Sequence, residues 1–242
     1  MIPWLGRALA FPPLESALQE PNGLLAAGGD LGPDRLLLAY QQGIFPWFSP
    51  GDPILWWSPD PRMVLYPQEL HIPRSLAKTV RNRSYEIRLD TAFRRVIEAC
   101  AQSPRPGQDG TWIVPEVADA YSRLHELGWA HSAECWMDGE LVGGLYGVAI
   151  GKMFYGESMY AHRPDASKLA FVHLVQWLRA AGFGLIDCQM RTAHLSRFGG
   201  REISRSEFLA TMRRLIAQPG LTGHWQYQPP AGLGGLNGGE VP

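Results

Sequence analysis

The sequence contains few cysteines and no apolar run long enough to span a membrane. Its three cysteines, Cys100, Cys135 and Cys188, are an odd number without a CxxC pair. This pattern excludes a disulfide framework and a zinc knuckle. The longest weakly polar stretch, residues 141–151, is about half the length that crosses a bilayer and is interrupted by glycines. The first residues show no signal sequence, so we expect a soluble, cytoplasmic protein with no membrane contact.

Lysine is also scarce, and arginine carries most of the positive charge. The chain of 242 residues has a formal net charge of −1, but residues 71–95 and 191–214 are rich in arginine. A local basic excess on a near-neutral protein is typical of a surface that faces phosphate groups. Solvated helix faces would give the same clusters, so both interpretations stay open. An apolar fraction of 45% can fill the core of one large domain, alone or with a small appendage.

Proline, glycine and tryptophan dominate residues 1–62, where we expect mostly irregular structure. A short helix is predicted over 33–42, because Pro33 stands near its start and Gly43 follows its end. Residues 43–62 hold three tryptophans and two phenylalanines between five prolines. Proline removes backbone donors and restricts its neighbours. This segment is therefore predicted to form a rigid lip, and neither a central strand nor a long helix.

Helical and strand patterns alternate from Met63 onward. The predicted helices cover residues 73–83, 91–102, 115–127, 165–181, 193–198 and 204–217. The predicted strands cover residues 85–89, 130–137, 141–150, 153–160 and 184–189. The turn Asp138-Gly139 joins the second and third of these strands into a hairpin. Residues from Pro229 to the end have the composition of a disordered tail.

Two polar side chains end an apolar strand pattern at residues 183–189. Side chains alternate along a strand, so Asp187 and Gln189 are predicted to share one face. A carboxylate and a carboxamide are costly to bury in an apolar sheet without a partner or a task. Glu157 places a second carboxylate in the middle of another apolar, aromatic strand. The two acids could orient an amine, but Asp187 and Gln189 could equally cap the helix that follows.

A strand meander, a long helix and a further strand follow one another as in the GNAT acyltransferase core. Ordinary members of that fold bind the pyrophosphate of acetyl-coenzyme A through a glycine-containing loop at the start of the helix. Here the corresponding linker, residues 160–168, contains no glycine, and Pro164 lacks a backbone donor. The sequence therefore argues against acetyl-coenzyme A as the donor.

Several long motifs resemble one bacterial family. They are EPNGLLAAGGDLGPDRLLLAYQQGIFPWFSPGDPILWWSPDPR (20–62), GTWIV (110–114), AYSRLHELG (120–128), LVGGLYGVAIGKMFYGESMY (141–160) and LIDCQ (185–189). From about residue 11 to residue 225 the chain is similar to leucyl/phenylalanyl-tRNA–protein transferases. The resemblance implies transfer of Leu, Phe and, less readily, Met from aminoacyl-tRNA to proteins with an N-terminal Arg or Lys. This reaction marks those proteins for degradation in the N-end rule pathway.

The resemblance also implies an α+β fold with a small N-terminal domain attached to a GNAT-like domain. The expected boundaries are 1–62 for the first, 63–228 for the second and 229–242 for the tail. The GNAT-like domain is expected to contain a mixed, mainly antiparallel sheet flanked by helices. The reaction is an acyl transfer from an ester to an α-amine, so neither a metal nor a cofactor is implied. A monomer is expected.

By similarity, Asp187 and Gln189 form the catalytic pair. Asp187 is expected to polarise and fix the Gln189 carboxamide, whose oxygen receives the N–H of the attacking amine. Glu157 is expected to add negative charge beside the basic N-terminal residue; the alternative is a strand residue paired with a nearby arginine. An α-amine has a reference pKa of about 7.7–8.0, so part of it is already neutral and needs mainly orientation and one proton relay.

The resemblance assigns three further groups of residues. A dry pocket for the aminoacyl side chain is expected from Leu145, Phe154, Phe171, Leu174, Leu178 and Ile186, although each taken singly fits a plain core position. Trp47 and Trp112 are candidates for stacking on the 3′-terminal adenosine, and a core position competes with that role for Trp47. Arg74, Lys78, Arg81 and Arg83 are expected to contact the tRNA phosphates.

Two functions of other kinds stay compatible with the sequence. The first is a GNAT-type acyltransferase with another activated donor, which a test of acyl-coenzyme A binding would distinguish. The second is a non-catalytic adaptor that binds basic N-termini or tRNA without turnover. The Asp187–Gln189 pair favours chemistry over the adaptor.

Overall fold

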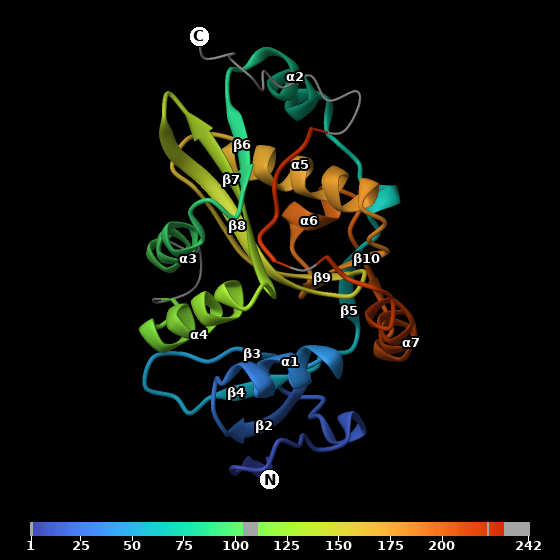
Figure 1. Ribbon diagram of the computed structural model, residues 1–242. Coiled ribbons are helices and arrows are strands. Elements are labelled where there is room, and N and C mark those ends of the chain that lie inside the picture. The colour runs from blue at the N-terminus through green and yellow to red at the C-terminus, as the bar shows by residue number, and fades with distance from the viewer. Residues whose placement is uncertain (1, 104–110, 222, 230–242) are drawn as a thin grey trace.

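Two β-sheets organise the molecule, a computed structural model that describes residues 2–103, 111–221 and 223–229 (Figure 1). The smaller sheet lies at the N-terminal end of the molecule, and the larger one carries most of the helices (Figure 1). The tail predicted from residue 229 onward falls, apart from Pro229 itself, outside the described residues.

The small sheet is built from the Pro- and Trp-rich N-terminal residues. Its strands are β1 (Trp4–Leu5), β2 (Leu24–Gly28), β3 (Phe45–Pro46) and β4 (Leu55–Trp57), in the order β1-β2-β4-β3. The pair β1–β2 is parallel, and the other pairs are antiparallel. The 3₁₀ turn η1 (Leu14–Ser16) and helix α1 (Pro33–Gln41) complete this region. Helix α1 agrees with the prediction, and Gly43 after it adopts the left-handed conformation with φ 76°.

One expectation for this region is wrong, because β4 is an interior strand. It lies between β2 and β3, although proline was expected to prevent a central strand in residues 43–62. The reason is local, since the three residues of β4 contain no proline and Pro53 and Pro59 stand outside it. Trp56 at its centre is fully buried and donates from Nε1 to the Gly28 carbonyl at 2.9 Å.

The large sheet has seven strands in the order β11-β5-β10-β9-β8-β7-β6. They are β5 (Arg62–Leu65), β6 (Glu86–Leu89), β7 (Ala130–Met137), β8 (Glu140–Ile150), β9 (Met153–Ala161), β10 (Leu185–Gln189) and β11 (Arg201–Ile203). Only β9 and β10 pair in parallel; the other neighbours are antiparallel. The predicted strands and the hairpin at Asp138-Gly139 are confirmed, whereas β5 and β11 were not predicted.

Helices cover both faces of the large sheet. They are α2 (Arg74–Asn82), α3 (Phe93–Gln102), α4 (Pro115–Glu126), α5 (Ala166–Ala180), α6 (Ala193–Arg197) and α7 (Arg205–Ile216), with the 3₁₀ turn η2 (Pro67–Glu69) before α2. Helix α5 packs on β7, β8 and β9 from one face, and α3 and α4 cover the other face (Figure 1). Each face has its own apolar cluster. The predicted α+β class with a mixed, mainly antiparallel sheet is therefore confirmed.

Strand β5 is the first strand of the large sheet in the chain and follows directly after β4 of the small sheet. It begins at Arg62 and lies between β10 and β11, so the proposed division after residue 62 cuts into a strand of the large sheet. We keep the boundary between residues 62 and 63 as a proposal. As for membranes, every helix within the described ranges is too short or too polar to cross a bilayer.

Candidate active site

An apolar cavity of about 390 Å³ opens where the two sheets meet. Its walls come from β3, β8, β9, β10 and α5, from Trp112 in the segment before α4, and from α6 and the segment that leads into it. Glu157 and Gln189 stand on its wall together with apolar and aromatic side chains. A cavity that is mostly apolar with a few convergent polar groups is the usual form of a small-molecule site.

Asp187 forms a buried ion pair with Arg62 beside this cavity. Arg62 donates from Nε to Oδ1 at 2.9 Å and from Nη2 to Oδ2 at 2.7 Å, and the two side chains are 1% and 0% exposed. The guanidinium also donates to the Gly43 carbonyl at 3.2 Å and lies between the rings of Phe45 and Phe208. This fork fixes the carboxylate and neutralises its charge in the protein interior.

Gln189 leaves the regular strand geometry directly after Asp187. The register of β10 against β5 shifts between these two residues, and Gln189 has φ 62°. The backbone N–H of Gln189 donates to Asp187 Oδ1 at 2.9 Å, so the carboxylate stabilises a left-handed conformation that is uncommon outside glycine. The expectation of a shared strand face therefore gives way to a bulge that Asp187 holds in place.

The carboxamide of Gln189 is held by Glu157. Its Nε2 donates to Glu157 Oε1 at 3.0 Å, whereas the oxygens of Asp187 bind Arg62 and a backbone N–H. The expectation that Asp187 itself fixes the carboxamide is therefore wrong. Since Nε2 is bound to the acid, the carboxamide oxygen is the atom left to receive a proton donor.

Glu157 lies within a network of hydroxyl groups. Tyr40 donates to Oε1 at 2.7 Å, Tyr121 donates to Oε2 at 3.2 Å, and the two hydroxyls contact each other. Burial raises the pKa of Glu157 to about 7, and the nearby Asp187 adds to the increase, while the hydrogen bonds from the tyrosines and Gln189 oppose it. Burial and the acid together raise the pKa of both tyrosines, which stay protonated donors. Among the described residues, Glu157 is bound by Tyr40, Tyr121 and Gln189 and by no arginine, so the alternative of an arginine partner is wrong.

The structure places most of the residues predicted to bind the aminoacyl donor around the cavity. Leu145, Phe154, Phe171, Leu174 and Ile186 line the cavity, as do Trp47 and Trp112. Leu178, also on α5, is the exception, because it is fully buried in the apolar cluster that α5 shares with the large sheet and is not among the residues that line the cavity. Trp47 lies edge-on to Trp57 with ring centroids 5.5 Å apart, and its carbonyl accepts from Trp57 Nε1 at 2.6 Å. The ring is thus positioned by its neighbour.

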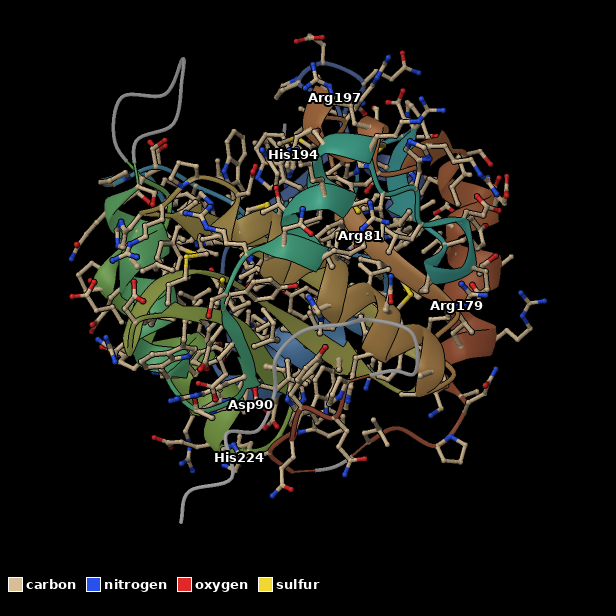
Figure 2. All side chains as sticks on the ribbon, turned by 90° about the horizontal axis from the view of Figure 1, so that it is seen from above. Arg81, Asp90, Arg179, His194, Arg197 and His224 are labelled. Atoms are coloured by element: carbon tan, nitrogen blue, oxygen red, sulfur yellow. The ribbon has the colours of Figure 1, made fainter. Side chains whose placement is uncertain are left out.

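The four basic residues form a separate surface on α2. Arg74, Lys78 and Arg81 are exposed and follow one another at helical spacing on one face, while Arg83 is half-buried and donates to the Pro164 carbonyl at 2.8 Å. None of them lines the cavity. In the view from above, Arg81 lies on the α2 side of the molecule (Figure 2). The sequence therefore predicted a surface that is distinct from the cavity.

Three residues that position the site were not predicted from the sequence. Arg62 and Tyr40 come from the Pro- and Trp-rich region and its helix, and Tyr121 comes from α4. An arginine at the end of an apolar, aromatic segment was a usable signal for Arg62, because such a charge needs a buried partner. The two tyrosines gave no signal of this kind, since each fits the apolar face of an ordinary helix.

The large sheet combines the antiparallel strands β7, β8 and β9 with a parallel strand β10, and Glu157 stands on the wall of the apolar cavity. The family model described as leucyl/phenylalanyl-tRNA protein transferase matches residues 64–213, and that of its N-terminal domain matches residues 29–60. The chain belongs to this family and is an aminoacyltransferase.

Similar proteins with this family's name cover nearly the whole chain. The Leucyl/phenylalanyl-tRNA--protein transferase of Chromobacterium violaceum is 63% identical over 227 residues, which are 94% of this chain and 97% of that protein. The protein of the same name from Laribacter hongkongensis is 59% identical with the same coverage, 94% and 97%. A GCN5-related N-acetyltransferase structure from Kribbella flavida aligns with a TM-score of 0.37 and 14% identity over 71% of this chain and 61% of that one.

Proposed function

We propose that this enzyme transfers Leu, Phe and, less readily, Met from aminoacyl-tRNA to the α-amine of proteins that begin with Arg or Lys. The observation that carries the proposal is the Glu157–Gln189 pair on the wall of an apolar cavity. The apolar cavity suits the uncharged side chain of the transferred amino acid. The Glu157–Gln189 pair offers oxygen atoms that can accept hydrogen bonds from the α-amine of the acceptor protein. The modified proteins would be marked for degradation by the N-end rule pathway, and we propose that the enzyme acts as a monomer in the cytoplasm.

The apolar wall supports the choice of donor. Five of the six predicted pocket residues line the cavity together with further apolar side chains, and a charged or amide side chain would have to leave water there without a partner. Trp47 and Trp112 on the same wall offer aromatic faces for the terminal adenosine, and stacking contributes about 1–3 kcal/mol per base. We infer that the aminoacyl side chain enters between β8, β10 and α5 while the adenosine stays near the tryptophans.

The acid supports the choice of acceptor. In the proposed step, the neutral α-amine nitrogen attacks the ester carbonyl carbon, a peptide bond forms, and the bond from that carbon to the ribose oxygen breaks. The amine donates a hydrogen bond to the Gln189 carboxamide oxygen, and its proton passes to Glu157 before the ribose oxygen takes one up. A pKa of about 7 makes Glu157 a better base near neutral pH than an ordinary carboxylate. Its ionised form also favours a basic residue beside the amine.

Arg62 and Asp187 act as positioning residues in this proposal. Asp187 fixes the backbone of Gln189, and Arg62 fixes Asp187. The basic face of α2, which contains Arg74, Lys78 and Arg81, is proposed to bind tRNA phosphates, with Arg83 at its end. Phosphate contacts position a nucleic acid without reading its sequence, so different tRNA bodies would be accepted.

Label transfer from radioactive Leu-tRNA tests the proposal. A protein that begins with Arg should be labelled, and the same protein beginning with Glu should not. The substitution Glu157→Gln should lower kcat by roughly 10²–10⁴-fold, the range for a lost general base. Glu98→Gln, which makes the same change on the exposed face of α3, is the control and should behave as the parent. Equal labelling of both acceptors, or full activity of Glu157→Gln, would refute the assigned roles.

A further inference from the structure

A second cluster of chemically active side chains lies away from the cavity. Asp90 follows β6, His125 lies in the last turn of α4, and His224 belongs to the C-terminal segment. One ligand atom from each lies within 4.8 Å of the others. Asp90 and His224 are neighbours at the same edge in the view from above (Figure 2). None of the three lines the cavity.

Asp90 is built to hold its carboxylate in one place. Its side chain is 1% exposed, and its backbone adopts the left-handed region with φ 56°. The carboxylate accepts from the Ser132 N–H at 2.8 Å, from the Trp225 N–H at 2.6 Å and from His131 Nδ1 at 2.8 Å. These partners fix the orientation of both oxygens, as outer hydrogen bonds do for ligating carboxylates.

His125 has the hydrogen bond that orients metal-binding histidines. Its Nδ1 lies 2.8 Å from the Ala130 carbonyl oxygen, which can only accept, so Nδ1 carries the proton. Nε2 then keeps its lone pair for a ligand, and Nδ1 lies 3.9 Å from Asp90 Oδ1. The ring is stacked on Phe93 with centroids 4.3 Å apart, so its orientation is fixed.

His224 supplies the third group from the surface. Its ring lies edge-on to that of His125, with centroids 4.6 Å apart. The residue is exposed, so its side chain can rotate toward the separation of about 3.4 Å that tetrahedral ligands at about 2.1 Å require. Two imidazoles and one carboxylate suit Zn²⁺ and neighbouring transition metals and suit Mg²⁺ poorly.

We propose that Asp90, His125 and His224 bind a divalent transition-metal ion, with Zn²⁺ as the best fit, and that this ion fastens the C-terminal segment to the large sheet. Trp225, next to His224, stacks on His131 with ring centroids 3.6 Å apart. Its ring also lies beside that of Phe154, with centroids 6.1 Å apart. Phe154 lines the cavity. The ion thus supports the wall of the donor pocket from behind and takes no part in the transfer step.

Calorimetric titration with Zn²⁺ tests the site in the full chain after treatment with a chelator. The parent should bind one ion, and His224→Ala should bind at least about 10–100-fold more weakly, because a lost ligand costs no less than a lost outer-shell partner. His71→Ala is the matched control, because it removes another exposed histidine outside the cluster. Since the His224 side chain is exposed, its removal should leave the fold intact, which circular dichroism verifies.

Thermal unfolding with and without Zn²⁺ gives a second readout. An ion that binds the folded chain raises Tm, so Zn²⁺ should stabilise the parent and His71→Ala but not His224→Ala. Mg²⁺ at the same concentration should have no such effect. Unchanged Zn²⁺ affinity in His224→Ala, an equal response to Mg²⁺, or a parent that binds no Zn²⁺ at micromolar concentration would overturn the proposal.

Discussion

Replacing Asp187 by Asn should unfold the enzyme more easily and also slow the transfer reaction. The substitution keeps the size of the side chain and removes its charge, so the Arg62 guanidinium is left buried without a counterion. Both side chains are at most 1% exposed, and solvent cannot compensate for the loss. The neighbouring rings of Phe45 and Phe208 offer only cation–π contacts at 4.7 Å.

The expected loss of stability follows from this burial. Removing one partner of a buried ion pair costs about 3–5 kcal/mol, whereas an exposed pair contributes about 0–1 kcal/mol. For a chain of this size, each kcal/mol shifts Tm by about 2–4 °C, so Tm should fall by roughly 6–20 °C. A well-packed apolar replacement of both partners is often neutral. The double variant Arg62→Met with Asp187→Leu should therefore recover most of the stability.

Activity separates the two roles of the pair. The double variant lacks the carboxylate that accepts the Gln189 N–H, so the bulge in β10 loses its support. It should fold and bind Leu-tRNA nearly as the parent does, while its turnover stays low. Urea unfolding and label transfer, measured on parent, single and double variants, give these quantities.

Two results would refute this reasoning. A loss below about 1 kcal/mol in Asp187→Asn would show that the pair behaves as an exposed one. Parental turnover in a folded double variant would show that Asp187 does not position Gln189. The first outcome would refute the stability argument, and the second would remove Asp187 from the residues that position Gln189.

Three further predictions follow from the site and the basic surface. Because the pKa of Glu157 is about 7 and the acceptor α-amine, with a pKa of about 7.7–8.0, also loses its proton as pH increases, kcat/KM of the parent should rise more steeply below pH about 7 than that of Glu157→Gln, which keeps only the rise from the amine. The raised pKa also means that the free energy of unfolding of the parent, measured by urea titrations, falls relative to that of Glu157→Gln as pH increases from 4.5 through 7. Phe171→Asp should abolish Leu transfer but retain binding of uncharged tRNA, measured by filter binding, and parental transfer of Leu would show that the cavity is not the donor pocket. Reversing Arg74 and Arg81 to Glu should flatten the salt dependence of tRNA binding by about 0.9 per lost phosphate contact. Arg7→Glu is the control, because it changes a residue close in sequence to the N-terminus, which lies at the opposite end of the molecule from α2 (Figure 1), and equal slopes would place tRNA elsewhere.

Local patterns predicted the elements of the fold because the signals are local. The hairpin between β7 and β8 turns at Asp138 and Gly139, which have φ 53° and 77°, the conformation that this residue pair prefers. Helix α1 begins at a proline and is followed by a glycine for equally local reasons. Strands β5 and β11 gave no such signal, because each is short and is stabilised by pairing with strands distant in sequence.

The candidate site was only partly predictable for the same physical reason. The sequence indicated Asp187, Gln189 and Glu157 through their cost in an apolar sheet. It could not show which group satisfies which, because Arg62 and Asp187 are 125 positions apart and Tyr40 and Glu157 are 117 positions apart. The bulge at Gln189 also breaks the alternation on which the shared-face prediction depended.

These distant contacts change the role of the N-terminal region. It supplies Tyr40 to Glu157, and the Gly43 carbonyl binds the same Arg62 guanidinium that holds Asp187. The ion pair of the buried acid in β10 and one of the hydrogen bonds to Glu157 therefore depend on residues before β6, and no single sheet contains the whole site. A chain without residues 1–62 would leave Asp187 as an unpaired buried charge and would remove one of the hydroxyls that hold Glu157. We therefore infer that the small sheet is part of the catalytic unit.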